Sequence, residues 1–339
     1  PKTADELRQS FLSFFESKDH LILPSSSLIP SGDPTLLLTN SGMAQFKAYF
    51  SGEKEPPQKR ITTVQKCFRT TDIEEVGDDT HLTLFEMLGN FSFGDYFKKE
   101  ACEWALEFMI EVLGFEKDRL FITIYKDDDE TKDIWLNLGI EEKYIYKFGD
   151  EDNWWGPAGE EGPCGPCSEL HYYQGDKRNM SFNDPNWGPN LHEDFIELYN
   201  LVFTQFYRDI EGNDKPLPFN NIDTGMGLER TVSVLNNQET AYKTDIFNDH
   251  LEMLNNIVSK DDMESQKYKR IIAEHGRSAS FLIADGVLPE NTGRGYVLRR
   301  LIRRAMVTAK KLSLELDYRT QRDFLLNLYK LFLSNHNGS

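Results

Sequence analysis

Two strand-like runs carry residue types that suit a phosphorylated ligand. The first run ends at Arg69, and after an acidic loop the second run brings His81 and Phe85. An arginine fork grips a phosphate through two parallel hydrogen bonds, and an aromatic ring on the facing strand can stack against a base. A structural ion pair of Arg69 with Glu74 or Glu86 would explain the same residues, so the pattern alone leaves both interpretations open.

The segment "NIDTGMGLERTVSVL" (221–235) is a second candidate for ligand binding. Asp223 lies at the end of a strand-like run, and Arg230 lies at the start of a helix-like run. Between them, Gly225 and Gly227 would let the backbone approach a ligand closely. A tight turn followed by a helix cap fits the same spacing equally well.

The segment "GRGYVLRRLIRRAMVTAKK" (293–311) gathers positive charge in a strongly acidic protein. At about 100° per residue, its cationic side chains fall within one helical arc of roughly 140°, and apolar residues fill the rest. These cations are Arg299, Arg300, Arg303, Arg304, Lys310 and Lys311. The arc is either a solvated face that neutralises acidic neighbours or a track for a phosphate backbone.

The stretch "GPCGPCSELH" (162–171) has the spacing of zinc ligands. A zinc site normally needs four ligands, and Cys164 and Cys167 supply only two of them. Cys67 and Cys102 belong to other elements, and no second pair of cysteines has this spacing. A redox pair of the thioredoxin kind would start a helix, whereas the prolines and glycines here predict a rigid loop. We therefore expect neither zinc nor thiol chemistry.

Composition sets limits on the class of protein. The chain has 339 residues, a formal net charge of −18 and 39% hydrophobic residues. This charge argues against general affinity for nucleic acids or anionic membranes, so a polyanion would have to meet a local basic patch. No apolar run approaches the roughly 20 residues that span a bilayer, and the first residues do not resemble a signal peptide. With four cysteines, a reduced, cytoplasmic protein is expected.

The elements that must position these residues follow from hydrophobic periodicity and turn signals. The predicted helices cover about 3–15, 98–113, 127–139 and 225–236, with Thr3 and Glu6 as a capping box at the start of the first. The predicted strands cover 61–70, 81–94, 119–125 and 194–209. Residues 149–193 are expected to be mostly loop. The fold class is α+β: a mostly antiparallel sheet with flanking helices over 1–239, followed by an all-helical domain over 240–339.

Five strings in the sequence resemble the alanyl-tRNA synthetase family of class II aminoacyl-tRNA synthetases. They are "TNSGMAQFK", "FEMLGNFSFGDYF", "GPCGPCSE", "DTGMGLER" and "NTGRGYVLRR", and the likeness runs from about residue 3 to 311. The two segments around Arg69 and Arg230 resemble motifs 2 and 3 of the class. The resemblance implies an enzyme that condenses alanine with ATP to alanyl-adenylate, using Mg²⁺, and transfers alanine to the 3′ end of tRNA(Ala).

The resemblance also implies roles in ATP binding. Arg69 would hold the α-phosphate and the alanine carboxylate. Arg230 would contact the γ-phosphate and cover one face of the adenine, and Phe85 would stack on the other face. His81 would lie near the phosphates, and Glu197 would coordinate Mg²⁺, unless Glu197 is simply a carboxylate on a strand face.

For alanine, the resemblance implies a pocket built from residues far apart in the sequence. Asp223 would anchor the ammonium group and Gly225 would leave room for the methyl group. Trp155 would form one wall, and Asn200 lies three residues after Glu197 in the same predicted strand. A methyl pocket discriminates by only about 1–3 kcal/mol against glycine or serine.

For tRNA, Asn291 matches a position that in the family reads the G·U pair of the acceptor stem, although asparagine also suits a helix cap. The arginines expected to bind tRNA are Arg299, Arg300, Arg303 and Arg304. The family's partnering aspartate would lie beyond residue 339, so the chain is either part of a longer protein or a small enzyme that recognises tRNA differently. Without the family's oligomerising module, a monomer is expected. An adenylate-forming paralogue with another acceptor, and a non-catalytic nucleic-acid-binding module, are the rival hypotheses.

Overall fold

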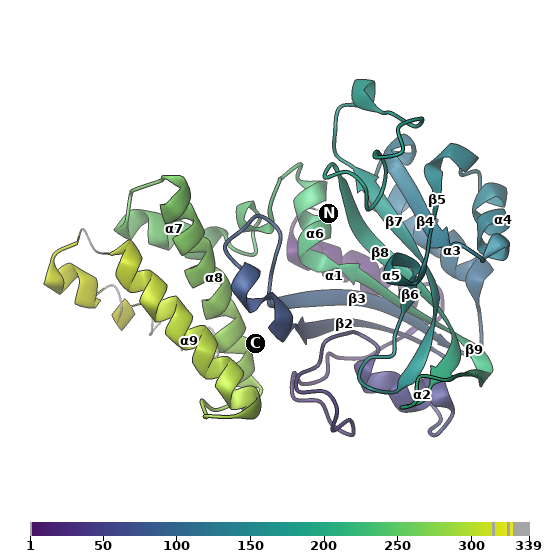
Figure 1. Cartoon of the computed structure of the whole chain (residues 1–339), viewed down its shortest axis with the longest axis horizontal. Coiled ribbons are helices and arrows are strands. Elements are labelled where there is room, and N and C mark those ends of the chain that lie inside the picture. Colours follow the sequence, from purple (N-terminus) through teal and green to yellow (C-terminus); the bar gives the residue numbers. More distant parts are fainter. Residues whose placement is uncertain (1, 314–315, 324–325, 328–339) are drawn as a thin grey trace. The chain divides into compact units, whose positions relative to one another are not determined.

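The computed structural model divides into two compact units (Figure 1). The structure describes residues 2–313, 316–323 and 326–327. The first unit contains the chain up to Ser26, Ser41–Gln65 and Glu86–Leu235. The second unit contains Ser27–Asn40, Lys66–Phe85 and the chain from Asn236 onward. The last part of the expected helical domain, 328–339, lies outside the described residues.

A mixed sheet, mostly antiparallel, forms the centre of the first unit. Its strands are β1 (Leu21–Ile22), β2 (Arg60–Phe68), β3 (Leu84–Phe93), β4 (Leu120–Tyr125), β5 (Ile145–Phe148), β6 (Trp154–Trp155), β7 (Gly162–Tyr173), β8 (Phe195–Arg208) and β9 (Asp214–Gly227). Their order is β1-β2-β3-β9-β8-β7-β4-β5, with β6 paired to β7. The pairs β3/β9, β9/β8, β8/β7 and β7/β4 are antiparallel. The pairs at the two edges of the sheet, β1/β2 and β4/β5, are parallel. The predicted sheet class and the long strand near 194–209 are confirmed.

The prediction of a loop at "GPCGPCSELH" is wrong, because this stretch is the first part of β7. A register shift between Cys164 and Cys167 interrupts the pairing with β8. At Gly165 the two backbones approach so closely that a Cβ atom would lie 1.9 Å from the carbonyl oxygen of Phe203. Glycine is therefore required for close strand contact here, and it does not signal a loop.

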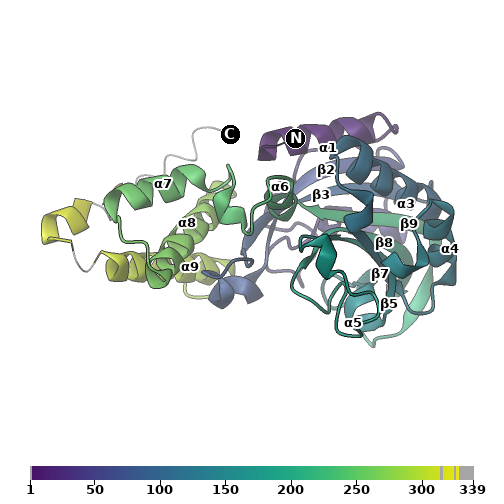
Figure 2. The same ribbon diagram turned by 90° about the horizontal axis from the view of Figure 1, so that it is seen from above.

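Helices α1 (Ala4–Glu16) and α3 (Lys98–Glu107) cover one face of this sheet (Figure 2). Thr3 caps α1 as predicted, since its hydroxyl oxygen accepts a hydrogen bond from the Glu6 amide at 3.1 Å. The ring of Phe11 lies 5.2 Å from that of Phe108, in the turn that continues α3, and 6.2 Å from that of Tyr199 on β8. These buried rings leave the opposite face of β8 for polar side chains. Two further helices of this unit are α4 (Asp129–Asn137) and α6 (Leu228–Leu235).

The second unit is built around α7 (Asn248–Ile257), α8 (Met263–Ala284) and α9 (Gly293–Leu312). The loop between β2 and β3 packs against these helices: buried Phe68, Ile73 and Leu84 share an apolar cluster with Leu298 and Leu301. Helices after residue 240 were expected from the sequence, whereas this inclusion of residues 66–85 was not. Among the described residues, no helix has the length and apolar character needed to cross a bilayer.

Candidate active site

Polar side chains of β7, β8 and β9 gather on one face of the sheet. Glu169 on β7 lies opposite Asn200 on β8, which in turn lies opposite Gly225 on β9. Two residues along, Val202 lies opposite Asp223. Because every second residue of a strand points to the same side, all five share one face. The predicted alanine-binding residues Asn200, Asp223 and Gly225 therefore lie on adjacent strands.

A β-bulge brings Glu197 to the same face. Residues three apart on a regular strand, such as Glu197 and Asn200, point to opposite sides. Here Leu170 lies opposite Tyr199 while His171 lies opposite Glu197, so β8 contains one extra residue at this point. The bulge reverses the alternation and returns Glu197 to the side of Asn200.

Glu169, His171 and Glu197 form a cluster of titratable groups, in which Glu169 and His171 are buried and Glu197 is half-buried. His171 Nε2 lies 3.0 Å from Glu169 Oε1, and the Thr123 hydroxyl donates to the same oxygen at 3.1 Å. Burial, together with the charge of Glu169, raises the pKa of Glu197 to about 7. Burial also raises the pKa of Glu169 and lowers the pKa of His171 to about 4. Near neutral pH Glu197 is therefore partly protonated, and a nearby cation would displace that proton.

Asp223 places a buried carboxyl group on this face. Burial raises its pKa from the usual 3.8 to about 8. Among the described residues, none pairs with this side chain through a hydrogen bond or an ion pair. Such a group is costly unless a ligand supplies the missing charge. At the neighbouring Gly225, a Cβ atom would lie 2.6 Å from the sulfur of Met87 on β3, so the space above this glycine is occupied by a flexible side chain.

Further buried atoms on this face have no hydrogen-bond partner in the described part of the chain, among them Asn200 Oδ1, His171 Nδ1, Thr204 Oγ1 and Asn221 Oδ1. Buried polar atoms are almost always hydrogen-bonded in a finished structure. Together with Asp223, they make this face an incomplete polar surface. An incomplete surface of acceptors is what a polar or cationic ligand requires.

Trp155 lies beside this surface. It is on β6, opposite Gly165 on β7, and it packs against an aromatic layer that includes Phe46 and Phe91. Phe91 belongs to β3, where Ser92 lies opposite Ile222, so Phe91 is in register with Asp223 on β9. The sheet thus places an apolar wall next to the buried carboxylate.

Arg230 is an exposed residue in the first turn of α6, directly after β9. Its positive charge acts on both Glu197 and His171, in the direction that favours ionised Glu197. The preceding residue, Glu229, is buried, and its carboxylate accepts a hydrogen bond from the Glu86 amide at 3.0 Å. Glu229 therefore ties the start of α6 to β3.

The remaining predicted ATP-binding residues belong to the second unit. The Arg69 guanidinium lies 5.0 Å from the centre of the Phe85 ring, and the Arg69 amide donates to the Thr83 carbonyl at 2.9 Å. His81 is half exposed, and its Nδ1 lies 2.5 Å from Asp78 Oδ2. The two glutamates that offered Arg69 a structural ion pair have other partners. Glu74 pairs with Arg300, and Glu86 pairs with Arg8.

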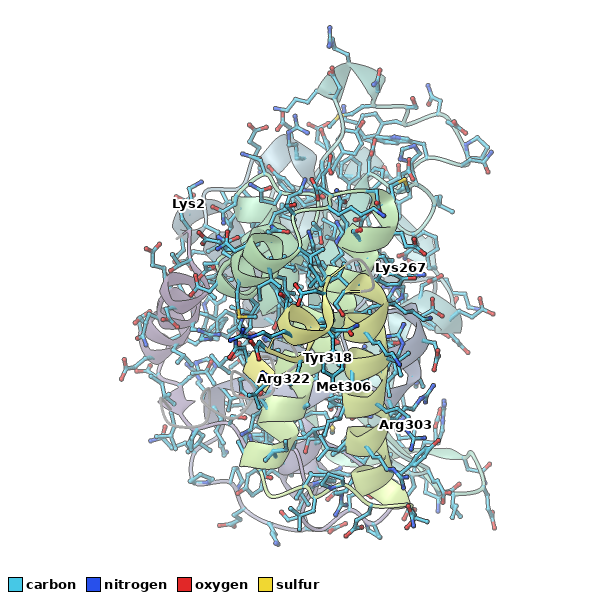
Figure 3. The ribbon with its side chains drawn as sticks, turned by 90° about the vertical axis from the view of Figure 1, so that its left-hand side faces the viewer. Lys2, Lys267, Arg303, Met306, Tyr318 and Arg322 are labelled. Carbon is cyan, nitrogen blue, oxygen red and sulfur yellow. The ribbon has the colours of Figure 1, made fainter. Side chains whose placement is uncertain are left out.

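The basic arc on α9 is divided by its contacts. Arg304 turns inward, donating to the carbonyl oxygens of Ile73 at 2.8 Å and Val76 at 3.1 Å. Arg303 is exposed on the outer side of the helix (Figure 3). Asn291 is exposed, and its side-chain oxygen accepts from Arg299.

Two corrections follow for this segment. The helix cap of α9 is Thr292, so the alternative role of Asn291 as the cap does not apply. The structure also separates the predicted tRNA-binding arginines into exposed ones and ones engaged with the loop at 73–76. The exposed arginines are Arg299 and Arg303, and Lys310 and Lys311 of the same basic arc are exposed as well.

The sequence of this chain is similar to those of known proteins. The family model described as "tRNA synthetases class II (A)" matches residues 6–334. The chain belongs to this family. It is 50% identical over 316 residues to an alanine–tRNA ligase of Dehalococcoides mccartyi (strain ATCC BAA-2266 / KCTC 15142 / 195), covering 92% of this chain and 36% of that protein. It is 52% identical over 338 residues to an alanine–tRNA ligase of Pseudothermotoga lettingae, covering 96% and 39%. The chain thus spans little more than a third of the length of these relatives.

Solved synthetase structures are more distant. A pyrrolysyl-tRNA synthetase from Desulfitobacterium hafniense is 12% identical, with a TM-score of 0.41 over 71% of this chain and 72% of that one. The S. aureus histidyl-tRNA synthetase is 12% identical, with a TM-score of 0.40 over 76% and 75%.

Within this class II chain, sequence reasoning missed several residues of the polar surface. Glu169 and His171 were not assigned to it because β7 was expected to be partly loop. A signal was present, since the alternation of Cys167, Glu169 and His171 is that of a strand with one polar face. Met87 and Phe91 carry no signal of their own, because apolar residues in a strand predict only burial.

Proposed function

We propose that this chain activates alanine with ATP and transfers the alanyl group to the 3′ end of tRNA(Ala). The single observation that carries the proposal is the buried, unpartnered carboxylate of Asp223 beside Gly225. The names of the relatives support the same substrate. Because the relatives are much longer, the activity of this chain alone is part of the proposal.

Alanine would bind with its ammonium group on Asp223. The incoming cation replaces the proton that the carboxyl group holds at neutral pH, and the buried pair then satisfies both charges. Asn200 Oδ1 offers a second acceptor on the same face. Met87, whose side chain lies over Gly225, and Trp155 would bound the methyl group, which limits the pocket to small side chains.

ATP would be held by the residues of motifs 2 and 3. In the reaction, an oxygen of the alanine carboxylate attacks the α-phosphorus, and the bond to pyrophosphate breaks. This chemistry needs alignment and neutralisation of charge more than a protein nucleophile. Arg69 would contact the α-phosphate and the alanine carboxylate, with His81 near the phosphates. Phe85 and Arg230 would cover the two faces of the adenine.

A magnesium ion bound with ATP fits the polar face. In the described part of the chain, no group of three or more histidine, cysteine, aspartate or glutamate residues has the geometry of a complete metal site. Magnesium is commonly held by one or two carboxylates together with substrate phosphates. Glu197 would be its protein ligand, and the ion would neutralise phosphate charge. Displacement of the proton on Glu197 would accompany its binding.

The acceptor stem of tRNA would meet the exposed side of α9. Arg303 and Arg299 are available there, with Asn291 at the start of the helix. Arg300 and Arg304 would contribute charge while bound to the loop of the same unit. We also propose that the chain acts as a monomer in the cytoplasm.

The test is alanine-dependent ATP–pyrophosphate exchange measured with all amino acids, alongside charging of tRNA(Ala). The proposal expects exchange with alanine, weaker exchange with glycine and serine, and charging of tRNA(Ala). Exchange without charging of any tRNA would favour an adenylate-forming enzyme with another acceptor. No exchange at saturating alanine would favour a non-catalytic nucleic-acid-binding module.

A further inference from the structure

A second glutamate–histidine pair lies in α8, far along the chain from Glu169 and His171. Glu274 and His275 are both completely buried. Glu274 Oε1 accepts hydrogen bonds from the Thr83 amide at 2.6 Å and from the Ser278 hydroxyl at 3.0 Å, and the Thr83 hydroxyl donates to it as well. A carboxylate held without water needs such donors at every acceptor position. Here the donors come mainly from the end of the loop between β2 and β3.

The protonation of His275 follows from its neighbours. Its Nδ1 lies 2.8 Å from Glu274 Oε2, and its Nε2 lies 2.7 Å from the Nη1 atom of Arg304. Arginine can only donate, so Nε2 must carry the lone pair and Nδ1 must carry the proton. His275 is therefore a neutral ring that donates to Glu274 and accepts from Arg304. The three side chains form a chain of hydrogen bonds with a fixed direction.

Both arms of the loop are attached to this chain of hydrogen bonds. At one end, Arg304 donates to the carbonyl oxygens of Ile73 and Val76. At the other end, Glu274 holds the Thr83 amide, while the Thr83 carbonyl accepts from the Arg69 amide at 2.9 Å. A shift of Thr83 would therefore shift Arg69.

Apolar packing alone does not specify this geometry. Ile73 and Leu84 already bury the loop against Leu298 and Leu301. Apolar contacts fix how deeply a segment is buried, but they tolerate small displacements along the surface. Buried hydrogen bonds restrict both direction and register, since a displaced donor leaves the carboxylate unsatisfied. The network thus adds the precision that a phosphate-binding arginine requires.

We propose that Glu274, His275 and Arg304 are positioning residues for Arg69, holding its backbone where the guanidinium lies over Phe85. The inference rests on the proposed function for the role of Arg69 itself. It assigns to α8 and α9 a part in the activation of alanine, in addition to any contact with tRNA. None of the three residues needs to touch a substrate.

The variant Glu274→Gln tests this chain of hydrogen bonds with little change of volume. The glutamine oxygen can still accept from Thr83, but its amide group then faces His275 Nδ1 as a donor. The ring must move its proton to Nε2, where it meets the donor atom of Arg304. We expect kcat for pyrophosphate exchange, per active site, to fall about 10²-fold, as a displacement of about 1 Å can cause. The KM for alanine should stay unchanged, because Asp223 belongs to the other unit.

Two controls separate positioning from simple loss of folding. Ile272→Val lies on the same helix, in an apolar cluster without polar contact to the loop, and should leave kcat unchanged. Arg304→Lys retains the charge but loses the fork, and should give a smaller, roughly tenfold loss. If Glu274→Gln keeps the wild-type kcat while melting at a lower temperature, the network is structural and the inference is overturned.

A double variant tests the path through Arg69. If Glu274 acts through Arg69, adding Glu274→Gln to Arg69→Ala should reduce exchange no further than Arg69→Ala alone. Multiplied losses would overturn the inference.

Hydrogen exchange of the amides in residues 70–84 provides a readout that needs no activity. It should be faster in Glu274→Gln and unchanged in Ile272→Val, and equal rates in both would overturn the inference. A wild-type chain that shows no pyrophosphate exchange would instead overturn the proposed function, and the amide rates would still decide whether the network holds the loop.

Discussion

The two units each bury a glutamate beside a histidine, and the two pairs differ in how fully they are hydrogen-bonded. In the first unit, Glu169 and His171 lie next to Glu197, the pKa values of both carboxyl groups are raised, and His171 Nδ1 has no partner. In the second unit, burial of Glu274 opposes ionisation, but hydrogen bonds from His275 and Thr83 hold its pKa below the usual value. The first arrangement lacks partners that a ligand can supply, whereas the second is complete without one. Buried polar groups that lack hydrogen-bond partners therefore indicate a binding surface. Buried polar groups with all their partners hold the structure in place.

The largest expected effect concerns the incomplete surface. Asp223→Asn removes the charge that would pair with the ammonium group, and a broken buried pair costs about 3–5 kcal/mol. The KM for alanine should rise roughly 10²- to 10³-fold, with the KM for ATP changed only a few-fold. Pyrophosphate exchange at varied alanine and varied ATP measures both. Equal effects on the two substrates would show that Asp223 is not the anchor.

The next largest effect is expected on stability when a buried glutamate is replaced by uncharged glutamine. Glu274→Gln should lower the free energy of unfolding by about 1–3 kcal/mol, because donors in a complete network lose a charged acceptor. Glu169→Gln should lower it by less, because burial disfavours the ionised form of Glu169 and raises its pKa. Denaturant unfolding monitored by circular dichroism compares the two. An equal loss of stability in both variants would show that the two buried glutamates do not differ in this way.

A smaller effect is expected on the exposed side of α9. Arg303→Glu should raise the KM for tRNA(Ala) roughly tenfold, about 1.4 kcal/mol, through repulsion of phosphate, and leave pyrophosphate exchange unaltered. Arg304→Glu should impair exchange as well, since Arg304 holds the loop. Lys99→Glu, an exposed charge reversal on α3, is the matched control and should change neither reaction. Loss of exchange in Arg303→Glu would place that residue among the structural ones.

The last prediction concerns the pH dependence of stability. Burial raises the pKa of Asp223 to about 8 and, with the charge of Glu169, that of Glu197 to about 7. Between the unfolded values near 4 and these folded values, the native state holds more protons than the unfolded state, so stability falls as pH rises. Each group contributes at most about 1.4 kcal/mol per pH unit. Thermal melts from pH 5 to pH 8 should show a shallower decline for Asp223→Asn, and an unchanged decline would contradict the raised pKa.

Some of this molecule follows directly from its sequence. The strand at β8, the helix at α9 and the capped helix at α1 were predicted because their periodicity and end signals agree. Glu197 and Asn200 were both assigned to the site from the resemblance, and the structure places them on one face, although their spacing on a regular strand would put them on opposite sides. Only the register of β7 against β8 reveals the bulge that reconciles them. A bulge depends on pairing between strands, which one strand's sequence does not contain.

The sequence also could not predict which arginines of α9 are exposed and which contact the loop at 73–76. Arg303 and Arg304 are adjacent and identical in type, yet one is exposed and the other donates to two carbonyl oxygens. The difference comes from the loop at 73–76, more than 200 residues earlier in the chain. Likewise, nothing local marks Glu274 as a buried acceptor, because an isolated glutamate in a helix normally predicts an exposed face.

Helix α9 contacts the loop at 73–76 through Arg304 and is exposed at Arg303, and this arrangement has a thermodynamic consequence. Arg304 joins the helix to the loop that carries Arg69, and the next residue back, Arg303, is open to a polyanion. If tRNA binding at Arg303 moves α9 even slightly, it changes the affinity of the loop for ATP by some factor. Linkage then requires ATP to change the affinity for tRNA by that same factor. Under the proposed function, measuring either binding constant with and without the other ligand would give the free energy of coupling between the exposed side of α9 and the loop that carries Arg69.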